Sequence, residues 1–186
     1  MIGFYKLLIN VVCFFAPLIL RIRIYNQKED KYRYSEKLCE IKKDRPKGKL
    51  VWFHASSVGE LLSIVSLSKK IEKNPNIKTI LFTTNTLSSA KLFEKITKSK
   101  KTIHQFLPFD KDIFVKKFLA HWDPDLAIFV ESEIWPNFIF NIKNKNIPLI
   151  LLNARITKKS YLRWKMIANF AKSIFSKFDI CLPQNK

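Results

Sequence analysis

The stretch LAIFVESEIWP, residues 126–136, places five apolar residues directly before a Glu-Ser-Glu turn, a tryptophan and a proline. A run this short and this apolar is typical of a strand in a parallel sheet that is covered on both faces. Proline is favoured in the first turn of a helix, so a helix is predicted to start here. The stretch therefore predicts one unit of an α/β sheet: a strand, a polar turn and a covering helix.

The same alternation continues on both sides of this unit. Short apolar runs are separated by longer stretches with apolar residues at helical spacing and lysines on the opposite face. This order predicts the α/β class, with a Rossmann-like, doubly wound parallel sheet. The predicted strands are Leu50–His54, Thr79–Thr83, Ile103–Leu107, Leu126–Val130, Leu149–Leu152 and Phe178–Leu182. The predicted helices are Glu60–Lys73, Leu87–Thr97, Lys111–His121, Pro136–Asn144 and Lys158–Ser176, with N-caps at Ser88, Asp110 and Thr157.

Length and charge limit the possible partners. The 186 residues suffice for one substantial core and an appendage. Lys and Arg number 34 against 15 Asp and Glu, and the net charge of +19 favours nucleic acid, anionic phospholipid or a phosphorylated substrate. We expect no nucleic-acid partner, because the aromatic residues are mostly Phe in apolar runs and not an exposed stacking platform. The three cysteines, without a CxxC pair, predict neither a disulfide framework nor a metal site.

The N-terminal residues form an apolar segment of their own. Residues 7–20 carry no charge, and Arg21 and Arg23 follow directly. This pattern predicts a membrane-anchor helix over residues 1–24, which either makes a short span or lies in the interface. The basic residues after it predict a cytoplasmic location for the remainder of the chain. The alternative is a buried first helix of the globular domain, kinked by Pro17.

A turn with two hydroxyls follows the first predicted strand. Ser56, Ser57 and Gly59 come just before Glu60, so hydroxyls and free backbone N–H groups lie at a helix N-terminus, where an anion is favoured. The alternative is a capping box with Ser57 as N-cap and Glu60 as its partner, which needs no ligand. One glycine is too few for a dinucleotide fingerprint or a P-loop.

Two carboxylates follow the most apolar strand. Glu131 and Glu133 are two residues apart, so on an extended strand end both side chains would point the same way, with a raised pKa. Such a pair suits acid–base chemistry or binding of sugar hydroxyls, and the alternative is that one glutamate caps the next helix. Arg155, after the fifth strand, would hold a phosphate or carboxylate or pair with one of the two glutamates, and we expect the internal pair.

Three further polar residues have weaker signals. Glu36 lies in a charged stretch before the first strand, and this context predicts an exposed, solvated side chain. His54 and His104 lie at strand ends and are predicted to be satisfied polar residues, because no metal-ligand spacing includes them.

Together these motifs resemble the 3-deoxy-D-manno-octulosonic acid (Kdo) transferases, which modify the lipid A precursor of Gram-negative bacteria. The resemblance covers almost the whole chain in order, and the Glu-x-Glu-x-Trp-Pro-Asn run is its most specific part. The matching motifs are the apolar N-terminus, Arg33–Glu36, His54–Glu60, Leu107–Asp110, Trp122–Leu126, Glu131–Asn137 and Asn153–Ile156 followed by Ser160.

The resemblance implies a metal-independent, inverting glycosyltransferase of the GT-B type, without a cofactor, whose donor is CMP-Kdo. It implies that the N-terminal domain binds the acceptor, lipid IVA, and that Glu36 is the general base for the acceptor hydroxyl. The residues implied to bind substrate are Ser56, Ser57, Gly59, Glu60, Glu131, Glu133 and Arg155. Family members often have glycines around Glu36, where Ser35 and Cys39 stand here, which predicts a backbone less free to take a positive φ.

The resemblance also suggests how the chain is divided. We expect a membrane anchor over 1–24, a basic connecting segment that carries the base over 25–49, and a Rossmann-like acceptor-binding domain over 50–186. A donor-binding domain is absent and would be required as a partner. The expected location is the cytoplasmic side of the inner membrane, where the acceptor is an anionic lipid. The alternative is an inactive truncated remnant that only binds anionic lipid or membrane.

Overall fold

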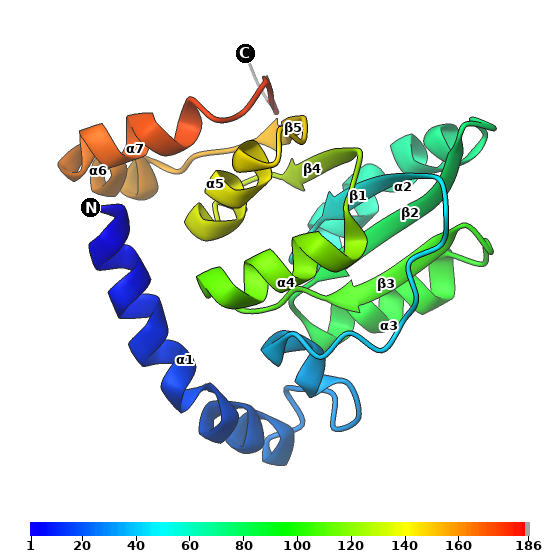
Figure 1. Ribbon diagram of the computed structural model, residues 1–186, viewed down its shortest axis with the longest axis horizontal. Helices are drawn as coiled ribbons and strands as arrows, with labels where there is room; N and C mark the ends of the chain where they lie inside the picture. The colour runs from blue at the N-terminus through cyan, green and yellow to red at the C-terminus, as the bar shows by residue number, and fades with distance from the viewer. Residues whose placement is uncertain (185–186) are drawn as a thin grey trace.

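A parallel sheet forms the centre of the computed structural model, which describes residues 1–184 (Figure 1). Its strands are β1 Lys49–His54, β2 Ile77–Thr84, β3 Thr102–Phe106, β4 Leu126–Val130, β5 Leu149–Ala154 and β6 Ile180–Pro183. The six strands lie in the order β3-β2-β1-β4-β5-β6, and each neighbouring pair is parallel. The predicted doubly wound, Rossmann-like α/β fold is therefore confirmed.

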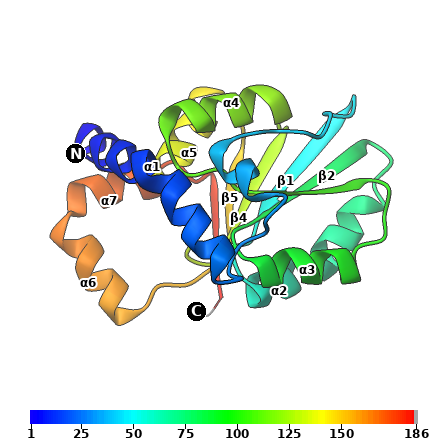
Figure 2. The same cartoon turned by 90° about the horizontal axis from the view of Figure 1, so that it is seen from below.

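Helices cover both faces of the sheet. They are α1 Ile2–Tyr25, the 3-10 helix η1 Tyr34–Leu38, α2 Val58–Glu72, α3 Leu87–Ile96, α4 Asp112–Trp122, α5 Pro136–Asn144, α6 Lys158–Met166 and α7 Ala168–Phe175. In Figure 2, α2 and α3 lie on one face, and α4 and α5 lie on the other. The domain therefore has three layers: helices, the sheet, and helices on the opposite face.

Two apolar cores form because side chains alternate between the faces of each strand. Trp52 belongs to the core beside α4 and α5, whereas its neighbours Val51 and Phe53 belong to the core beside α2 and α3. Trp52 is fully buried, and its ring centroid lies 5.0 Å from that of Phe118 and 5.2 Å from that of Phe129. The central strand therefore buries large side chains on both sides, as a parallel sheet requires.

The predicted helix caps are partly confirmed. Thr157 caps α6 as predicted, whereas the N-cap of α3 is Thr86 and not Ser88. Asp110 does not cap α4; its carboxylate accepts two backbone N–H groups in the first turn of α5, each at 2.9 Å. A residue on one connection thus caps a helix well beyond it in the chain, which helical periodicity alone does not reveal.

The last predicted helix, Lys158–Ser176, is two helices in the structure. Ile167 separates α6 from α7 and has φ −123° and ψ 44°, outside the helical region. No residue of α6 is buried, whereas α7 buries Phe170 and Ile174 in the core beside α5. The break therefore separates a surface helix from a packed one.

The N-terminal helix α1 is longer than the uncharged segment and runs along one side of the domain (Figure 1). Only Cys13, Ala16 and Leu20 are buried, so the alternative of a buried first helix is wrong. Within residues 1–184, α1 is the one helix long and apolar enough to cross a membrane. Length and composition make it a membrane candidate, and its contacts with the domain decide how it could lie.

Candidate active site

The strand order reverses between β1 and β4, because the chain leaves β1 toward β2 on one side and later places β4 on the other. Open α/β sheets bind ligands beyond the carboxyl ends of their strands at such a switch point. Two connections meet there, residues 55–57 after β1 and residues 131–135 after β4. They contain four of the residues that the sequence singled out, Ser56, Ser57, Glu131 and Glu133, so we call this edge the switch-point site.

His54, the last residue of β1, joins the two connections. Its Nε2 lies 2.9 Å from Oε2 of Glu133, and the indole N–H of Trp135 donates to the same oxygen at 2.8 Å. The other ring nitrogen, Nδ1, lies 3.0 Å from Oγ1 of Thr83. His54 is thus a satisfied, fully buried residue, as predicted, and it also fixes the position of Glu133. The residues from 1 to 184 contain no group of three or more potential metal ligands.

The turn before α2 is a helix cap in which both partners are engaged. Ser57 is the N-cap, and its hydroxyl accepts the N–H of Glu60 at 3.3 Å. The Glu60 carboxylate in turn accepts the Ser57 hydroxyl and the Ser56 N–H, both at 2.8 Å. The capping interpretation is therefore confirmed, although the backbone donor is Ser56 and not the N-cap itself.

Capping leaves part of the helix N-terminus available to a ligand. The N–H groups of Val58 and Gly59 have no hydrogen-bond partner within residues 1–184, and both residues are exposed. A Cβ atom placed on Gly59 would meet nothing within 4 Å. These two N–H groups lie at the positive end of the helix dipole, where an anion is stabilised.

Two carboxylates at this site have pKa values that move in opposite directions. Burial raises the pKa of Glu60 against its opposing hydrogen bonds, and the nearby Glu133 raises it further. Burial also acts to raise the pKa of Glu133, but its hydrogen bonds with His54 and Trp135 lower it overall. The expectation of a raised pKa at Glu133 is therefore wrong, and Glu60 is the more basic carboxylate of the two.

Glu131 and Glu133 are not a parallel pair on an extended strand end. The strand stops at Val130, and Glu131 has φ 57°, so its backbone is left-handed. Its side chain lines a cavity of about 740 Å³ together with exposed Arg155 and apolar residues of α6 and α7. Among the ion pairs of residues 1–184, none involves Arg155, so the expected internal pair with Glu131 or Glu133 is not present.

Glu36 is buried, with 7% of its surface exposed, so the prediction of a solvated side chain is wrong. Arg33 binds both carboxylate oxygens, at 2.8 and 3.1 Å, and the N–H of Phe106 donates to Oε2 at 2.7 Å. These contacts hold η1 against the end of β3. Cys39, which ends η1, has φ 63°, so it does take the left-handed conformation that the lack of glycine made unexpected.

A chain of polar contacts, which no sequence pattern predicts, connects η1 to the switch-point site. Lys37 is buried and donates to Glu29 at 2.7 Å and to the carbonyl of Asn85 at 2.9 Å. The Asn85 amide donates to the Ser56 hydroxyl at 2.6 Å. Glu29 and Lys37 lie in a charged stretch without apolar periodicity, where burial has no local signal.

His104 is satisfied in the same region, as predicted. Its Nδ1 lies 2.8 Å from the Arg33 guanidinium and its Nε2 lies 2.9 Å from the Thr84 hydroxyl. Burial and the neighbouring Arg33 and Lys43 charges hold the pKa of His104 well below its usual range. His104 therefore supports the position of Arg33, which in turn holds Glu36.

Comparisons with known proteins agree with one another. The family model described as 3-deoxy-D-manno-octulosonic-acid transferase (kdotransferase) matches residues 32–186. The chain is 40% identical over 171 residues to a 3-deoxy-D-manno-octulosonic acid transferase of Rickettsia bellii, covering 91% of this chain and 40% of that protein. It is 44% identical over 139 residues to the Rickettsia typhi protein of that name, covering 74% and 29%. For the Haemophilus influenzae protein the identity is 28% over 177 residues, covering 94% and 40%. The chain thus spans at most 40% of the length of these relatives.

Proposed function

The chain belongs to the family of 3-deoxy-D-manno-octulosonic acid (Kdo) transferases, and from this premise we propose that it is the acceptor-binding half of such an enzyme. The proposed reaction transfers Kdo from CMP-Kdo to a hydroxyl of a phosphorylated lipid A precursor, lipid IVA, with inversion at the sugar. The family match includes every strand of the sheet. Because the chain spans at most 40% of these relatives, we place the donor nucleotide on a further domain, in a GT-B arrangement.

The observation that carries this proposal is the position of two hydrogen-bonded carboxylates at the switch-point site: Glu60 is bound by Ser56 and Ser57, and Glu133 is bound by His54 and Trp135. Inverting transfer needs a base that takes the proton of the attacking hydroxyl, and a raised pKa suits a carboxylate to that role. Burial raises the pKa of Glu60, while Glu133 is held in its charged form by His54 and Trp135. We therefore propose Glu60 as the general base and Glu133 as the charge that keeps it basic.

The family resemblance assigned the base to Glu36 instead. Both carboxylates have both oxygens bonded: Arg33 and the N–H of Phe106 bind Glu36, whereas the N–H of Ser56 and the hydroxyl of Ser57 bind Glu60. To take a proton from substrate, Glu36 would have to give up its ion pair with Arg33, whereas Glu60 would give up only neutral donors, whose hydrogen bonds are weaker. We propose that Glu36 positions η1, and the experiment below separates the two carboxylates.

We propose that the first turn of α2 binds an acceptor phosphate. The N–H groups of Val58 and Gly59 have no partner among residues 1–184, both residues are exposed, and the helix dipole favours an anion there. Ser56 and Ser57 hold this turn in place through their contacts with Glu60. Exposed Arg155 would bind a second anionic group, and Glu131 beside it would accept sugar hydroxyls.

The proposed location is the cytoplasmic side of the inner membrane. An apolar helix, α1, and a net charge of +19 both suit a surface of anionic lipid. The proposed mechanism uses no metal or cofactor, because a carboxylate removes the proton and backbone N–H groups and Arg155 bind the anions.

Kdo transfer from CMP-Kdo to lipid IVA tests the proposal. The assay uses the chain alone and the chain with the C-terminal remainder of the Rickettsia bellii relative added as a separate polypeptide, each with Glu60→Gln and Glu36→Gln variants. We expect transfer only in the mixture, a loss in kcat of at least about 100-fold for Glu60→Gln, and a loss below about 10-fold for Glu36→Gln.

The other outcomes decide between the remaining candidates. If Glu36→Gln abolishes transfer and Glu60→Gln does not, Glu36 is the base. If no mixture transfers Kdo while the chain still binds vesicles that contain lipid IVA, the inactive remnant that only binds anionic lipid becomes the better description.

A further inference from the structure

One stripe of α1 contacts the globular domain along the whole length of the helix. The residues with the least exposed surface recur every three or four positions, which is the spacing of a single helix face. They are Ile2, Tyr5, Ile9, Cys13, Ala16, Leu20 and Ile24. A helix that left the domain to cross a bilayer would contact it at one end only, so this pattern describes a helix laid along the domain.

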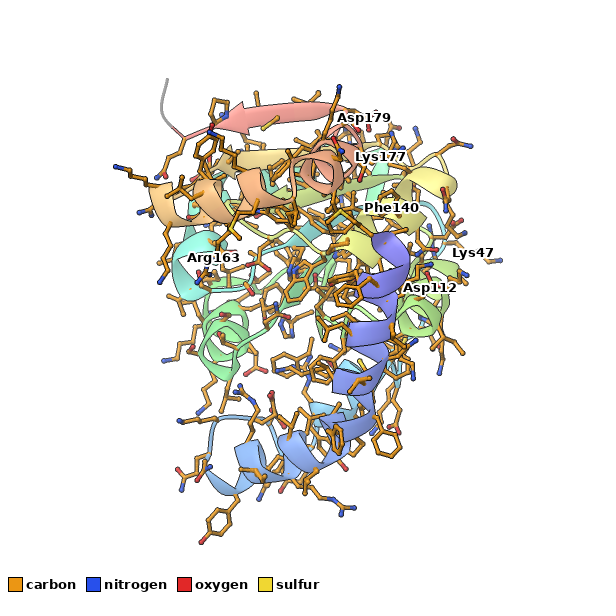
Figure 3. The ribbon with its side chains drawn as sticks, turned by 90° about the vertical axis from the view of Figure 1, so that its left-hand side faces the viewer. Lys47, Asp112, Phe140, Arg163, Lys177 and Asp179 are labelled. Atoms are coloured by element: carbon orange, nitrogen blue, oxygen red, sulfur yellow. The ribbon has the colours of Figure 1, made fainter. Side chains whose placement is uncertain are left out.

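Both ends of α1 are held by polar contacts. Near the start, the Tyr5 hydroxyl donates to Oδ2 of Asp110 at 2.7 Å, and Asp110 is itself buried. Near the end, Arg23 donates to Oε2 of Glu29 at 3.2 Å, and the Glu29 side chain has no exposed surface. Lys6 adds an ion pair with Asp112 at 3.0 Å, and Figure 3 shows Asp112 and Phe140 beside the first turns of α1.

The contact between Tyr5 and Asp110 keeps the N-terminal end of α1 beside the globular domain, which is incompatible with a span. Tyr5 and Arg23 are 18 residues apart in the sequence, and at about 1.5 Å per residue the helix between them is about 27 Å long. The hydrocarbon core of a bilayer is about 30 Å thick. A spanning α1 would therefore carry Tyr5 to the far side and break its contact with Asp110. It would also uncover the Cys13, Ala16 and Leu20 stripe.

The opposite side of α1 is apolar and uncovered. Phe4 is 74% exposed and Phe14 is 78% exposed. The other exposed apolar residues of this face are Leu7, Leu8, Val11, Val12, Phe15, Leu18, Ile19 and Ile22. Basic side chains, Arg21, Arg23, Lys28 and Lys31, follow directly at the C-terminal end. Apolar residues next to a basic cluster match the acyl chains and headgroups of an anionic bilayer.

We propose that α1 lies in the plane of the membrane interface, with this outer face among the acyl chains, and does not cross the bilayer. Both ends of α1 then stay on the same side as the globular domain, and every tether seen in the structure is kept. The ring of Tyr5 packs 6.4 Å from that of Phe170 in α7, a helix whose Ala168, Ala171 and Phe175 line the cavity beside Arg155. The inner stripe of α1, which lies opposite the membrane face, thus adjoins a wall of the proposed acceptor site.

Depth-dependent fluorescence quenching tests the orientation. The inference rests on the proposed membrane location, but the readout is helix depth and not sugar transfer, so the two can fail separately. Single cysteines replace Phe4, Val11 or Leu18 in a Cys181→Ser background, since Cys181 is the exposed native thiol and Cys13 and Cys39 are buried. Each carries an environment-sensitive fluorophore and is mixed with vesicles of phosphatidylglycerol and phosphatidylcholine that contain nitroxides at shallow or deep positions.

The three positions should behave alike if the helix lies flat. We expect a blue shift at each position and stronger quenching by the shallow nitroxide, with similar ratios for Phe4→Cys, Val11→Cys and Leu18→Cys. The matched control is Lys95→Cys on α3, which is exposed and far from α1 in sequence, and should show neither effect.

Two results would overturn the proposal. A spanning helix would make Val11→Cys the deepest position and would protect Phe4→Cys from dithionite added outside the vesicles. A fluorophore that shows no blue shift with anionic vesicles at any of the three positions would mean that something other than a bilayer, such as a second copy of the chain, covers this face.

Discussion

His54 Nε2 lies 2.9 Å from Glu133 Oε2, and the N–H of Ser56, two residues after His54, donates to Glu60 at 2.8 Å. The end of β1 therefore connects the cap of α2 to the connection after β4. Burial raises the pKa of Glu60, whereas hydrogen bonds lower the pKa of Glu133. Glu60 is therefore the better proton acceptor of the two, and Glu133 supplies a negative charge beside it.

The pH dependence of Kdo transfer should report on this pair. A general base acts in its deprotonated form, so activity should fall as pH drops through the raised pKa of Glu60. Glu133→Gln removes a negative charge that raises this pKa, so the acid limb of the kcat/KM profile should move to lower pH. The exposed Glu40 gives a matched control, and Glu40→Gln should leave the limb in place. An unchanged limb in Glu133→Gln would argue against Glu60 as the base.

Gly59→Ala should separate ligand binding from folding. A Cβ atom at Gly59 meets nothing within 4 Å, and alanine favours a helix over glycine by up to about 1 kcal/mol. The melting temperature should stay the same or rise, while the added methyl obstructs a phosphate that approaches the N–H groups of Val58 and Gly59. We expect the Kd for lipid IVA to rise at least about 10-fold, or about 1.4 kcal/mol.

The control for this substitution is Gly3→Ala in α1, where a Cβ atom also meets nothing within 4 Å. It should leave the Kd unchanged. Equal acceptor affinity in Gly59→Ala and the parent chain would mean that no anion binds close to this turn.

The free energy of unfolding should decrease as the pH rises from about 4 to about 6, because of Asp110. Burial raises the pKa of Asp110 from 3.8 to about 6, so the folded chain keeps a proton that the unfolded chain has lost. The stabilisation by protonated Asp110 is fully present below the pKa of Asp110 in the unfolded chain, 3.8. It is lost as the pH rises through the pKa of Asp110 in the folded chain, about 6. At about 1.4 kcal/mol per pKa unit, it amounts to at most about 3 kcal/mol.

Denaturant unfolding at pH 4, 5 and 6 measures this slope, and Asp110→Asn should flatten it. Asp179 is the control: hydrogen bonds from Lys143 and from the Leu149 N–H lower its pKa, so its own pH dependence lies below about pH 4. Asp179→Asn should keep the slope above pH 4. An Asp110→Asn variant with the parent slope would contradict the assignment.

Lys37→Met should destabilise the chain strongly. It removes the closer of the two cations that contact Glu29, whose side chain has no exposed surface, and it also removes the donor to the Asn85 carbonyl. Breaking a buried pair in this way costs about 3–5 kcal/mol in the free energy of unfolding. The double variant Glu29→Gln with Lys37→Met should recover part of that loss, as measured in a double-mutant cycle by urea unfolding.

The exposed pair between Lys143 and Asp179 is the comparison. Lys143→Met should cost less than about 1 kcal/mol, because solvent screens an exposed pair. Equal losses for the two lysine variants would show that the Lys37 pair is not isolated from solvent.

The sequence alone predicted the parallel sheet, because strands and helices leave local patterns: β4 matches its predicted range, and so does α5. The sequence also predicted that Ser57 caps α2, because its partner Glu60 lies three residues away. The helix of residues 158–176 was predicted as one, because the break at Ile167 changes backbone angles without a glycine or proline to mark it.

The burial of single charged residues was decided only by the tertiary structure. Glu36 was predicted to be solvated, yet its carboxylate accepts the N–H of Phe106, 70 residues further along the chain. Asp110 caps α5 and not α4, and α1 lies along the domain because Tyr5 reaches Asp110, 105 residues away. Periodicity reports which face of an element is apolar, but a buried charge depends on partners that only the folded chain brings within hydrogen-bonding distance.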